Sequence, residues 1–221
     1  MKRRLVIFGT GDIAQLAHYY FTADSSYKVV AFTVDASYIK EKIFCGLPVV
    51  AFEDVIDAFP PRDNELFVAL SYSKLNASRK EKFLAAKAKC YKIASYVSSR
   101  ASVLNNGQIG ENCFILEENT VQPFVKIGNN VTLWSGNHIG HHSVIRDHTF
   151  IASHVVLSGR VDIGEQCFLG VNATLRDNIK VGDRCVIGAG VLLLSDAEPE
   201  GVYLGPATDR SKVPSSRLRS I

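Results

Sequence analysis

The segment IGNNVT-LWSGNH-IGHHSV-IRDHTF-IASHVV, residues 127–156, begins every group of six residues with an aliphatic side chain. The same step of six runs from Val97 to Leu193, and all seventeen positions that it visits are Ile, Leu or Val. These three residue types fill about a quarter of the chain, so seventeen chance matches have a probability on the order of 10⁻¹⁰. The period of six is therefore a property of the fold.

A six-residue period fits neither an α-helix, with 3.6 residues per turn, nor the simple alternation of an ordinary strand. It is typical of short parallel strands that turn every six residues, with three strands in each coil and an 18-residue repeat between coils. Seven of the 16 glycines directly follow the periodic aliphatic residue. We expect these glycines at corners that need an unusual backbone dihedral angle. The pattern predicts a parallel β-helix of hexapeptide repeats.

The chain begins differently, with a strand–loop–helix pattern. A buried strand is expected at residues 4–8, followed by GTGDIA at residues 9–14 and a second strand at residues 28–32. Gly9 and Gly11 of this GxGxxA pattern would let a phosphate approach the backbone at a helix N-terminus, and Asp35 would bind a ribose hydroxyl. A tight strand–helix turn without a ligand is the alternative. About ninety residues form one mononucleotide-binding half, which favours a nucleotide over NAD.

These patterns predict an α/β chain in three parts: a Rossmann-like βαβ domain over residues 1–92, a left-handed parallel β-helix over residues 93–196, and a C-terminal capping tail over residues 197–221. A Lys-rich helix is expected at about residues 76–89. Its lysines Lys82, Lys87 and Lys89 are expected on a solvated face.

Composition excludes several kinds of partner. The net charge of +3 indicates no nucleic acid partner. No apolar run approaches the roughly 20 residues of a membrane span. The five cysteines are odd in number and contain no CxxC pair, which favours reduced thiols in the cytoplasm over a disulfide framework.

Five of the six histidines lie within residues 138–154. His142, His148 and His154 share one hexad phase on three successive faces, so they cannot converge within one chain. A zinc site would need a neighbouring subunit, and no metal is expected. His141 follows Gly140 at a corner and should project outward, where a histidine is a good candidate for a general base.

With the segment SGNHIGHHS, residues 135–143, these features resemble the sugar acyltransferases of the sialic acid O-acetyltransferase and bacillosamine N-acetyltransferase type. The resemblance covers nearly the whole chain and includes the GxGxxA start, Asp35, Asn76 and Arg79 after Leu70, the hexads, and the segment GPA at residues 205–207. It implies a homotrimer with active sites between adjacent β-helices. Acetyl-CoA would lie between the coils, and a nucleotide-linked amino sugar would reach from the N-terminal domain into the same cleft.

The resemblance also assigns roles to residues. It makes His141 the catalytic base, makes the Gly159 N–H the group that meets the thioester carbonyl, and puts Gly9, Gly11 and Asp35 in the nucleotide-sugar site.

Two departures concern the surroundings of the base. His142 stands where relatives often carry Asp or Glu, and Phe150 stands where some carry another histidine. We expect Asn137, His138 or His142 to orient the base instead.

The expected function is acetyl-CoA-dependent N-acetylation of a nucleotide-linked 4-amino-deoxy sugar in bacterial surface glycan biosynthesis, by direct transfer without an acyl-enzyme. The alternatives are an O-acetyltransferase of the sialic acid type, a zinc enzyme of the γ-carbonic anhydrase kind, and a non-catalytic trimerisation scaffold.

Overall fold

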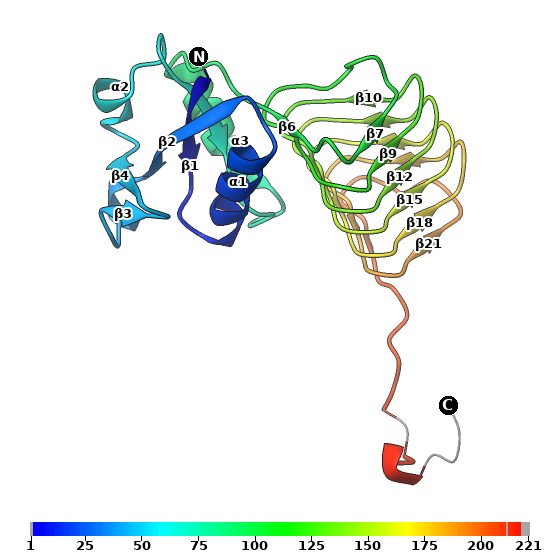
Figure 1. The fold of residues 1–221 in the computed structure, drawn as a ribbon. Coiled ribbons are helices and arrows are strands. Elements are labelled where there is room, and N and C mark those ends of the chain that lie inside the picture. Colours follow the sequence, from blue (N-terminus) through cyan, green and yellow to red (C-terminus); the bar gives the residue numbers. More distant parts are fainter. Residues whose placement is uncertain (1, 211, 218–221) are drawn as a thin grey trace.

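The N-terminal part is a five-stranded sheet with helices on both faces, in a computed structural model that describes residues 2–210 and 212–217 (Figure 1). The strand order is β3-β4-β2-β1-β5, and the neighbours are parallel except for the antiparallel β3–β4 pair. The elements are β1 (Arg3–Phe8), α1 (Asp12–Ala23), β2 (Tyr27–Val34), the 3₁₀ turn η1 (Ala36–Tyr38), β3 (Ile43–Phe44), β4 (Leu47–Ala51), α2 (Val55–Ala58), β5 (Glu65–Val68) and α3 (Ala77–Ala88).

The central strand β1 explains why this sheet is covered on both faces. Its side chains alternate, because successive residues of a strand point to opposite sides. Leu5 and Ile7 pack in the core on the α1 side, whereas Val6 and Phe8 pack in the core with residues of α2 and α3. A continuous apolar run is the sequence signature of a parallel strand buried on both faces.

The second part is a left-handed parallel β-helix with three faces, each made of two-residue strands. The first face contains β6 (Tyr96–Val97), β8 (Phe114–Ile115), β11 (Thr132–Leu133), β14 (Phe150–Ile151), β17 (Phe168–Leu169), β20 (Val186–Ile187) and β22 (Val202–Tyr203). The second face contains β7 (Ser102–Val103), β9 (Thr120–Val121), β12 (His138–Ile139), β15 (Val156–Leu157), β18 (Thr174–Leu175) and β21 (Leu192–Leu193). The third face contains β10 (Lys126–Ile127), β13 (Val144–Ile145), β16 (Asp162–Ile163) and β19 (Lys180–Val181).

The predicted coil and its 18-residue repeat are confirmed. Thr132 pairs with Phe150, and His138 pairs with Val156, one coil further along the chain. The periodic aliphatic residues from Ile115 to Leu193 are buried in one continuous core. Val97, at the start of the period, is exposed. The three hexad cysteines, Cys113, Cys167 and Cys185, are buried in this core as free thiols.

The expected reason for the repeated glycines is wrong. The left-handed backbone conformation falls three positions after the aliphatic residue, as at His142 with φ +60°, and not at the glycine one position after it. Gly110 shows what the glycines do, because an added Cβ would lie 2.6 Å from the Gly128 carbonyl carbon in the next coil. These glycines therefore allow successive coils to stack closely.

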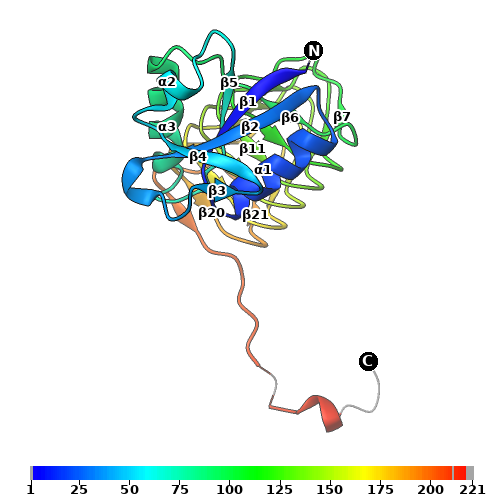
Figure 2. The ribbon, with the colours of Figure 1, turned by 60° about the vertical axis from the view of Figure 1, so that its left-hand side comes forward.

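The two parts share a buried joint, with the N-terminal sheet lying against the first face of the coil (Figure 2). Tyr96, Phe114 and Leu116 of the coil are buried in the same core as α1. Asn112 continues this contact with hydrogen bonds to both the N–H and the carbonyl of Val68, at the end of β5. The joint places the ends of β1 and β5 next to the coil.

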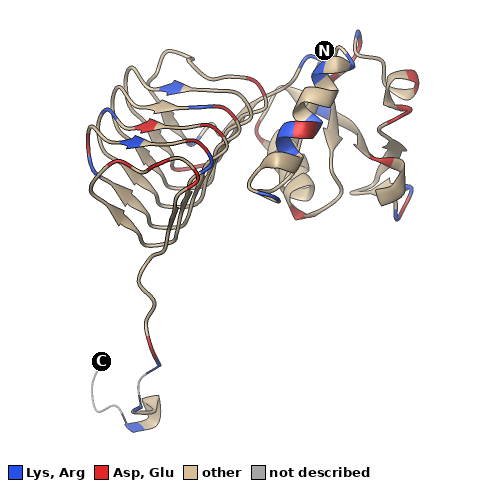
Figure 3. Ribbon diagram, turned by 180° about the vertical axis from the view of Figure 1, so that it is seen from behind, with Lys and Arg blue, Asp and Glu red and all other residues tan. Residues whose placement is uncertain are grey.

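The other regions of the coil are exposed. Charges of both signs occur on the third face (Figure 3), where Arg146 pairs with Asp162. The last turn of the β-helix is shorter than the others, because β22 pairs with β20 across 16 residues instead of 18. Strand β22 lies beyond residue 196, in the segment predicted as the tail. Gly205 still lies against Ala189, and beyond it the chain runs away from the body. The last element of the described residues is the 3₁₀ turn η2 (Ser215–Arg217).

Candidate active site

The loop between β1 and α1 has the geometry of a backbone cradle. Gly9 has φ +127°, and a Cβ there would lie 2.7 Å from the Ala69 carbonyl oxygen, so the position requires glycine. Nothing lies within 4 Å of a Cβ built on Gly11, which therefore borders open space. Because the first N–H groups of a helix have no partner within it, the start of α1 presents donors suited to an anion.

This loop borders a cavity of about 410 Å³, here called the loop pocket, which also contains Asp35. The structure thus places Gly9, Gly11 and Asp35, the three residues predicted for the nucleotide-sugar site, around one cavity. Lys82 also lines the pocket, with its Nζ 2.9 Å from Oδ1 of Asp35, and the two side chains are only 20% and 23% exposed. Burial acts to lower the pKa of Lys82, but the carboxylates of Asp35 and Glu81 raise it overall. The expectation that Lys82 lies on a solvated face is wrong.

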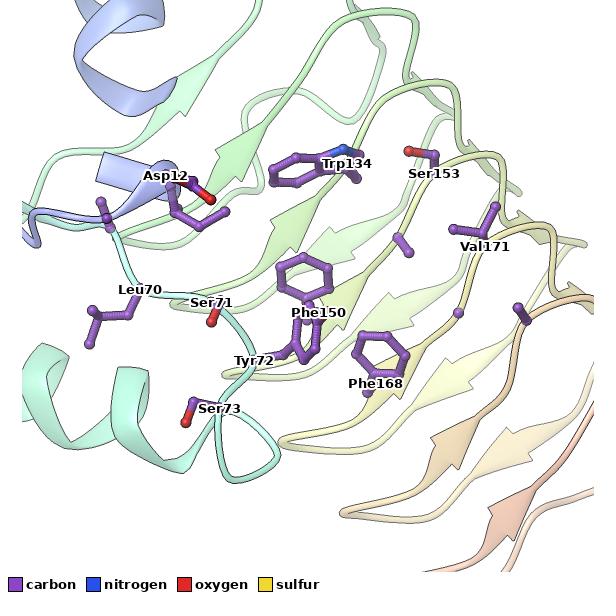
Figure 4. Close-up of a pocket in the computed structure, with 16 residues that line it drawn as sticks. Asp12, Leu70, Ser71, Tyr72, Ser73, Trp134, Phe150, Ser153, Phe168 and Val171 are labelled. Atoms are coloured by element: carbon purple, nitrogen blue, oxygen red, sulfur yellow. The ribbon is translucent and has the colours of Figure 1, made fainter. Parts of the chain in front are cut away.

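A larger cavity of about 770 Å³, here called the aromatic pocket, lies between the loop and the first face of the coil (Figure 4). Its apolar wall contains Trp134, Phe150 and Phe168, with Tyr72 packed against both phenylalanines. Polar groups at its edge come from Asp12, Ser71, Ser73 and Ser153. The sequence patterns described above do not indicate this pocket. The recurrence of Phe at 18-residue spacing, on the outward side of the first face, is the signal that would have indicated it.

His141 lies at a different corner, formed by the turn from Gly140 to Ser143 between the second and third faces. Its side chain is exposed, and its N–H donates to Oε1 of Gln122 at 2.8 Å. A Cβ on Gly159 would lie 2.7 Å from Cε1 and Nε2 of the His141 ring, so glycine is needed for the ring to occupy this place. Among the residues that the structure describes, none accepts a hydrogen bond from the Gly159 N–H. The imidazole and a free donor therefore lie side by side.

His142 contacts the same ring. The Nδ1 atoms of His141 and His142 are 3.1 Å apart, so one donates and the other accepts. Partial desolvation, followed by the charges of Arg160 and His141, lowers the pKa of His142. A neutral His142 can accept from the Nδ1–H of His141, which leaves Nε2 of His141 with a lone pair for a substrate proton.

Asn137 and His138 do not belong to this arrangement. Asn137 is buried, and its amide binds Oδ1 of Asn119, the Trp134 carbonyl and the Val155 N–H. These bonds use its donors and its acceptor inside the coil, so the expectation that Asn137 orients His141 is wrong. His138 is half-buried in β12, before the corner.

Neither pocket is lined by His141 or Gly159. The coil residues of the aromatic pocket belong to the first face and to the corner that follows it, whereas His141 follows the second face. Phe150 is part of the pocket wall and not of the His141 corner. Within one chain, the candidate base and the candidate nucleotide site therefore lie on different edges of the coil.

A buried polar network joins α3 to the coil; it comprises Asn76, Arg79, Asn112, Asn130 and His148 and is called here the joint network. The Arg79 guanidinium donates to the carbonyls of Asn130 and His148, to Oγ1 of Thr132 and to Oδ1 of Asn76. Arg79 is 1% exposed, and burial lowers its pKa to about 10, so it stays charged at neutral pH. The network holds the loop before α3, which lines both pockets.

Acid should weaken the joint network at His148. Burial, followed by the charge of Lys80, lowers the pKa of His148 to about 4, whereas an unfolded histidine titrates near 6.5. Below pH 6.5 the unfolded chain therefore binds a proton that the folded chain does not, so about 3 kcal/mol of stability should be lost between pH 6.5 and 4.

The matched variant is His148→Asn, because Asn130 occupies the equivalent left-handed position one coil earlier. Urea unfolding at pH 7 and pH 4.5 should show a smaller acid loss for the variant than for the unmodified chain. Equal losses in both proteins would mean that His148 does not cause the effect.

Within residues 2–210 and 212–217, no group of three or more His, Cys, Asp or Glu side chains is arranged to hold a metal ion. No helix in that part of the chain is long and apolar enough to cross a membrane.

Comparison with known families identifies the repeats. The model described as bacterial transferase hexapeptide (six repeats) matches residues 106–141 and 124–159, and the model described as hexapeptide repeat of succinyl-transferase matches residues 160–195. Together these matches cover the β-helix from within its first turn almost to its end.

Solved structures share the complete two-part fold. The acetyltransferase domain of PglB from Neisseria gonorrhoeae, in complex with acetyl coenzyme A, has a TM-score of 0.80 and 20% identity, over 93% of this chain and 97% of that one. A mutant of perosamine N-acetyltransferase from Caulobacter crescentus, in complex with CoA and GDP-perosamine, has a TM-score of 0.80 and 21% identity, over 94% and 97%. WeeI from Acinetobacter baumannii has a TM-score of 0.76 and 18% identity, over 91% and 96%. These likenesses confirm the predicted fold.

Proposed function

From the transferase-type hexapeptide repeats matched over residues 106–195, we propose that the chain transfers an acetyl group from acetyl-CoA to the amino group of a nucleotide-linked deoxy sugar. The observation that carries the proposal is the exposed imidazole of His141 above the free N–H of Gly159. An acyl transfer needs these two groups, a base for the nucleophile and a donor for the oxyanion.

The nucleotide would occupy the loop pocket. Its phosphates fit the backbone donors between Gly9 and the start of α1, and its ribose fits the carboxylate of Asp35, which is paired with Lys82. The sugar would extend toward the aromatic pocket, where Trp134 and Phe150 offer apolar surface to a deoxy sugar. The perosamine enzyme of C. crescentus binds a ligand of this class, GDP-perosamine. On this proposal, residues 1–92 form the nucleotide-sugar domain and residues 93–196 the acyltransferase domain.

A second copy of the chain would complete the site, because His141 and the two pockets lie on different edges of one coil. In a homotrimer, each N-terminal domain would face the His141 corner of the adjacent coil, and closed threefold symmetry would produce three equal sites. Acetyl-CoA would lie in the groove between the coils. We place the reaction in the bacterial cytoplasm, where the five free cysteines would remain reduced, and in the synthesis of surface glycans.

The proposed reaction proceeds by direct transfer. Nε2 of His141 takes a proton from the acceptor amine as its nitrogen attacks the thioester carbonyl carbon. The carbonyl oxygen becomes an oxyanion that accepts from the Gly159 N–H. The C–S bond then breaks, the proton passes from His141 to the CoA sulfur, and the products are the N-acetyl sugar and free CoA. His142 accepts from Nδ1 of His141 throughout, so the ring keeps its orientation.

The direct test is release of free CoA thiol by the purified protein, given acetyl-CoA and a panel of acceptors. We expect release with a GDP- or UDP-linked 4-amino-deoxy sugar, and mass spectrometry should show one added acetyl group on the sugar. The matched control is the same nucleotide sugar with a hydroxyl in place of the amine, which should react poorly. Release with sialic acid alone would instead establish an O-acetyltransferase. Stoichiometric zinc without acetyl transfer would favour the carbonic anhydrase alternative, and absence of CoA binding by calorimetry would favour a scaffold.

A further inference from the structure

The segment at residues 122–124 lies one turn of the β-helix before the His141 corner and contacts both histidines of the candidate site. Oε1 of Gln122 accepts from the His141 N–H at 2.8 Å, and the Pro123 carbonyl accepts from the His142 N–H at 3.3 Å. The Phe124 ring lies against the His142 ring, with centroids 4.6 Å apart and planes at 37°. Phe124 is thus the side chain that fills the space beside His142 on the side of the preceding coil.

Phe124 is an unusual residue for this place. Its φ is +67°, in the left-handed region that a bulky side chain rarely adopts. The same turn position elsewhere in the described coil contains Gly or polar residues, namely Asn106, Asn112, Glu118, Asn130, Gly136, His142, His148, His154, Arg160, Gln166, Asn172, Asn178, Arg184 and Gly190. Phe124 is also 59% exposed, so burial in its own chain does not favour it. Backbone strain at an exposed aromatic residue points to a local function.

We propose that Phe124 is a positioning residue, whose ring holds the His142 imidazole so that its Nδ1 faces Nδ1 of His141. The inference rests on the proposed function, in which His141 is the base. Without the ring, His142 would be free to turn about its side-chain torsions, and the hydrogen bond that fixes the tautomer of His141 would be lost for part of the time. Stacking also keeps water from one face of His142. Besides His141, the charged group that faces His142 is Arg160.

The test is Phe124→Asn, because Asn suits the left-handed turn and cannot stack. We expect three changes together. The Tm should rise by about 2–4 °C as the strain is relieved. The kcat should fall about 10-fold while both KM values stay unchanged, because the substrates still bind but the base is less well oriented. In NMR spectra of ¹³C-labelled histidine, the pKa of His142 should rise toward 6.5 as water reaches the ring.

Two further variants make the outcome decisive. Phe124→Tyr keeps the ring and should keep kcat and the His142 titration. Glu118→Asn makes the same kind of change at the preceding corner and should leave kcat unchanged. The inference is overturned if Phe124→Asn leaves kcat and the His142 titration unaltered, or if its chief effect is a loss of the oligomer by light scattering, which would make Phe124 a subunit contact. Failure of the proposed function would show separately, as full activity in a His141 variant, and would not alter the His142 titration result.

Discussion

Replacing His141 by alanine should lower kcat by about 10²- to 10⁴-fold at neutral pH, the usual contribution of a well-placed general base. The variant keeps the Gly159 N–H and both pockets, so acetyl-CoA and the nucleotide sugar should still bind. The loss should therefore appear in kcat and not in KM, in steady-state assays of CoA release. The coil should remain folded, because the His141 side chain is exposed and belongs to none of the three cores.

His154→Ala is the matched control for this experiment. The His154 ring also lies above a glycine, since a Cβ on Gly136 would be 2.6 Å from it, and it too is exposed. It occupies another corner of the coil, so its removal should change kcat less than twofold, within about 0.4 kcal/mol. Near-normal turnover in His141→Ala, or an equal loss in both variants, would contradict the role of His141.

Replacing Arg79 by methionine should destabilise the chain by about 3 kcal/mol or more. The change leaves the carbonyls of Asn130 and His148 without their donors in a buried place, and each unsatisfied group costs about 1–3 kcal/mol. We expect the Tm in differential scanning calorimetry to fall by about 6–12 °C. Because Arg79 joins α3 to the coil, hydrogen exchange should increase first at the joint network, before the centre of the coil.

Arg79→Lys and Arg62→Met complete this experiment. Lysine keeps the charge, but one ammonium group cannot match the planar guanidinium that binds four acceptors, so this variant should also be less stable. Arg62 is an exposed arginine paired with Asp63, and its change to methionine should alter stability by less than about 0.5 kcal/mol. An unchanged Tm in Arg79→Met would show that the two parts are joined by their apolar contacts alone.

The coil could be predicted in detail because its order is local and periodic. One aliphatic side chain per six residues, from Ile115 to Leu193, must point inward if short strands turn at regular intervals. The role of the glycines was harder to infer, because close stacking and an unusual dihedral angle both favour glycine. Only the position of the neighbouring turn of the β-helix distinguishes these two reasons for glycine, as the contact of Gly110 with Gly128 shows.

The parts that sequence patterns missed depend on contacts between distant segments. Lys82 sits in a Lys-rich helix typical of a solvated surface, but the fold turns it toward Asp35, 47 residues earlier. The aromatic pocket likewise exists only where Tyr72 of the loop meets Phe150 and Phe168 of the coil. Asn137 lies beside the His141 segment in sequence, yet its phase in the hexad turns it inward.

The regular stacking of the coil has a consequence for how its length can change. From β6 to β21 each strand pairs with its neighbour 18 residues along the chain, so His141 and Gly159 meet because they are 18 positions apart. An insertion of six residues between them would rotate every later strand by one face, and would carry Gly159 to another edge of the triangle. An insertion of one complete coil would keep the edge but separate the two residues by about 4.8 Å more. The segment between His141 and Gly159 should therefore tolerate single substitutions but no change in length. Insertions and deletions should be confined to other turns of the β-helix.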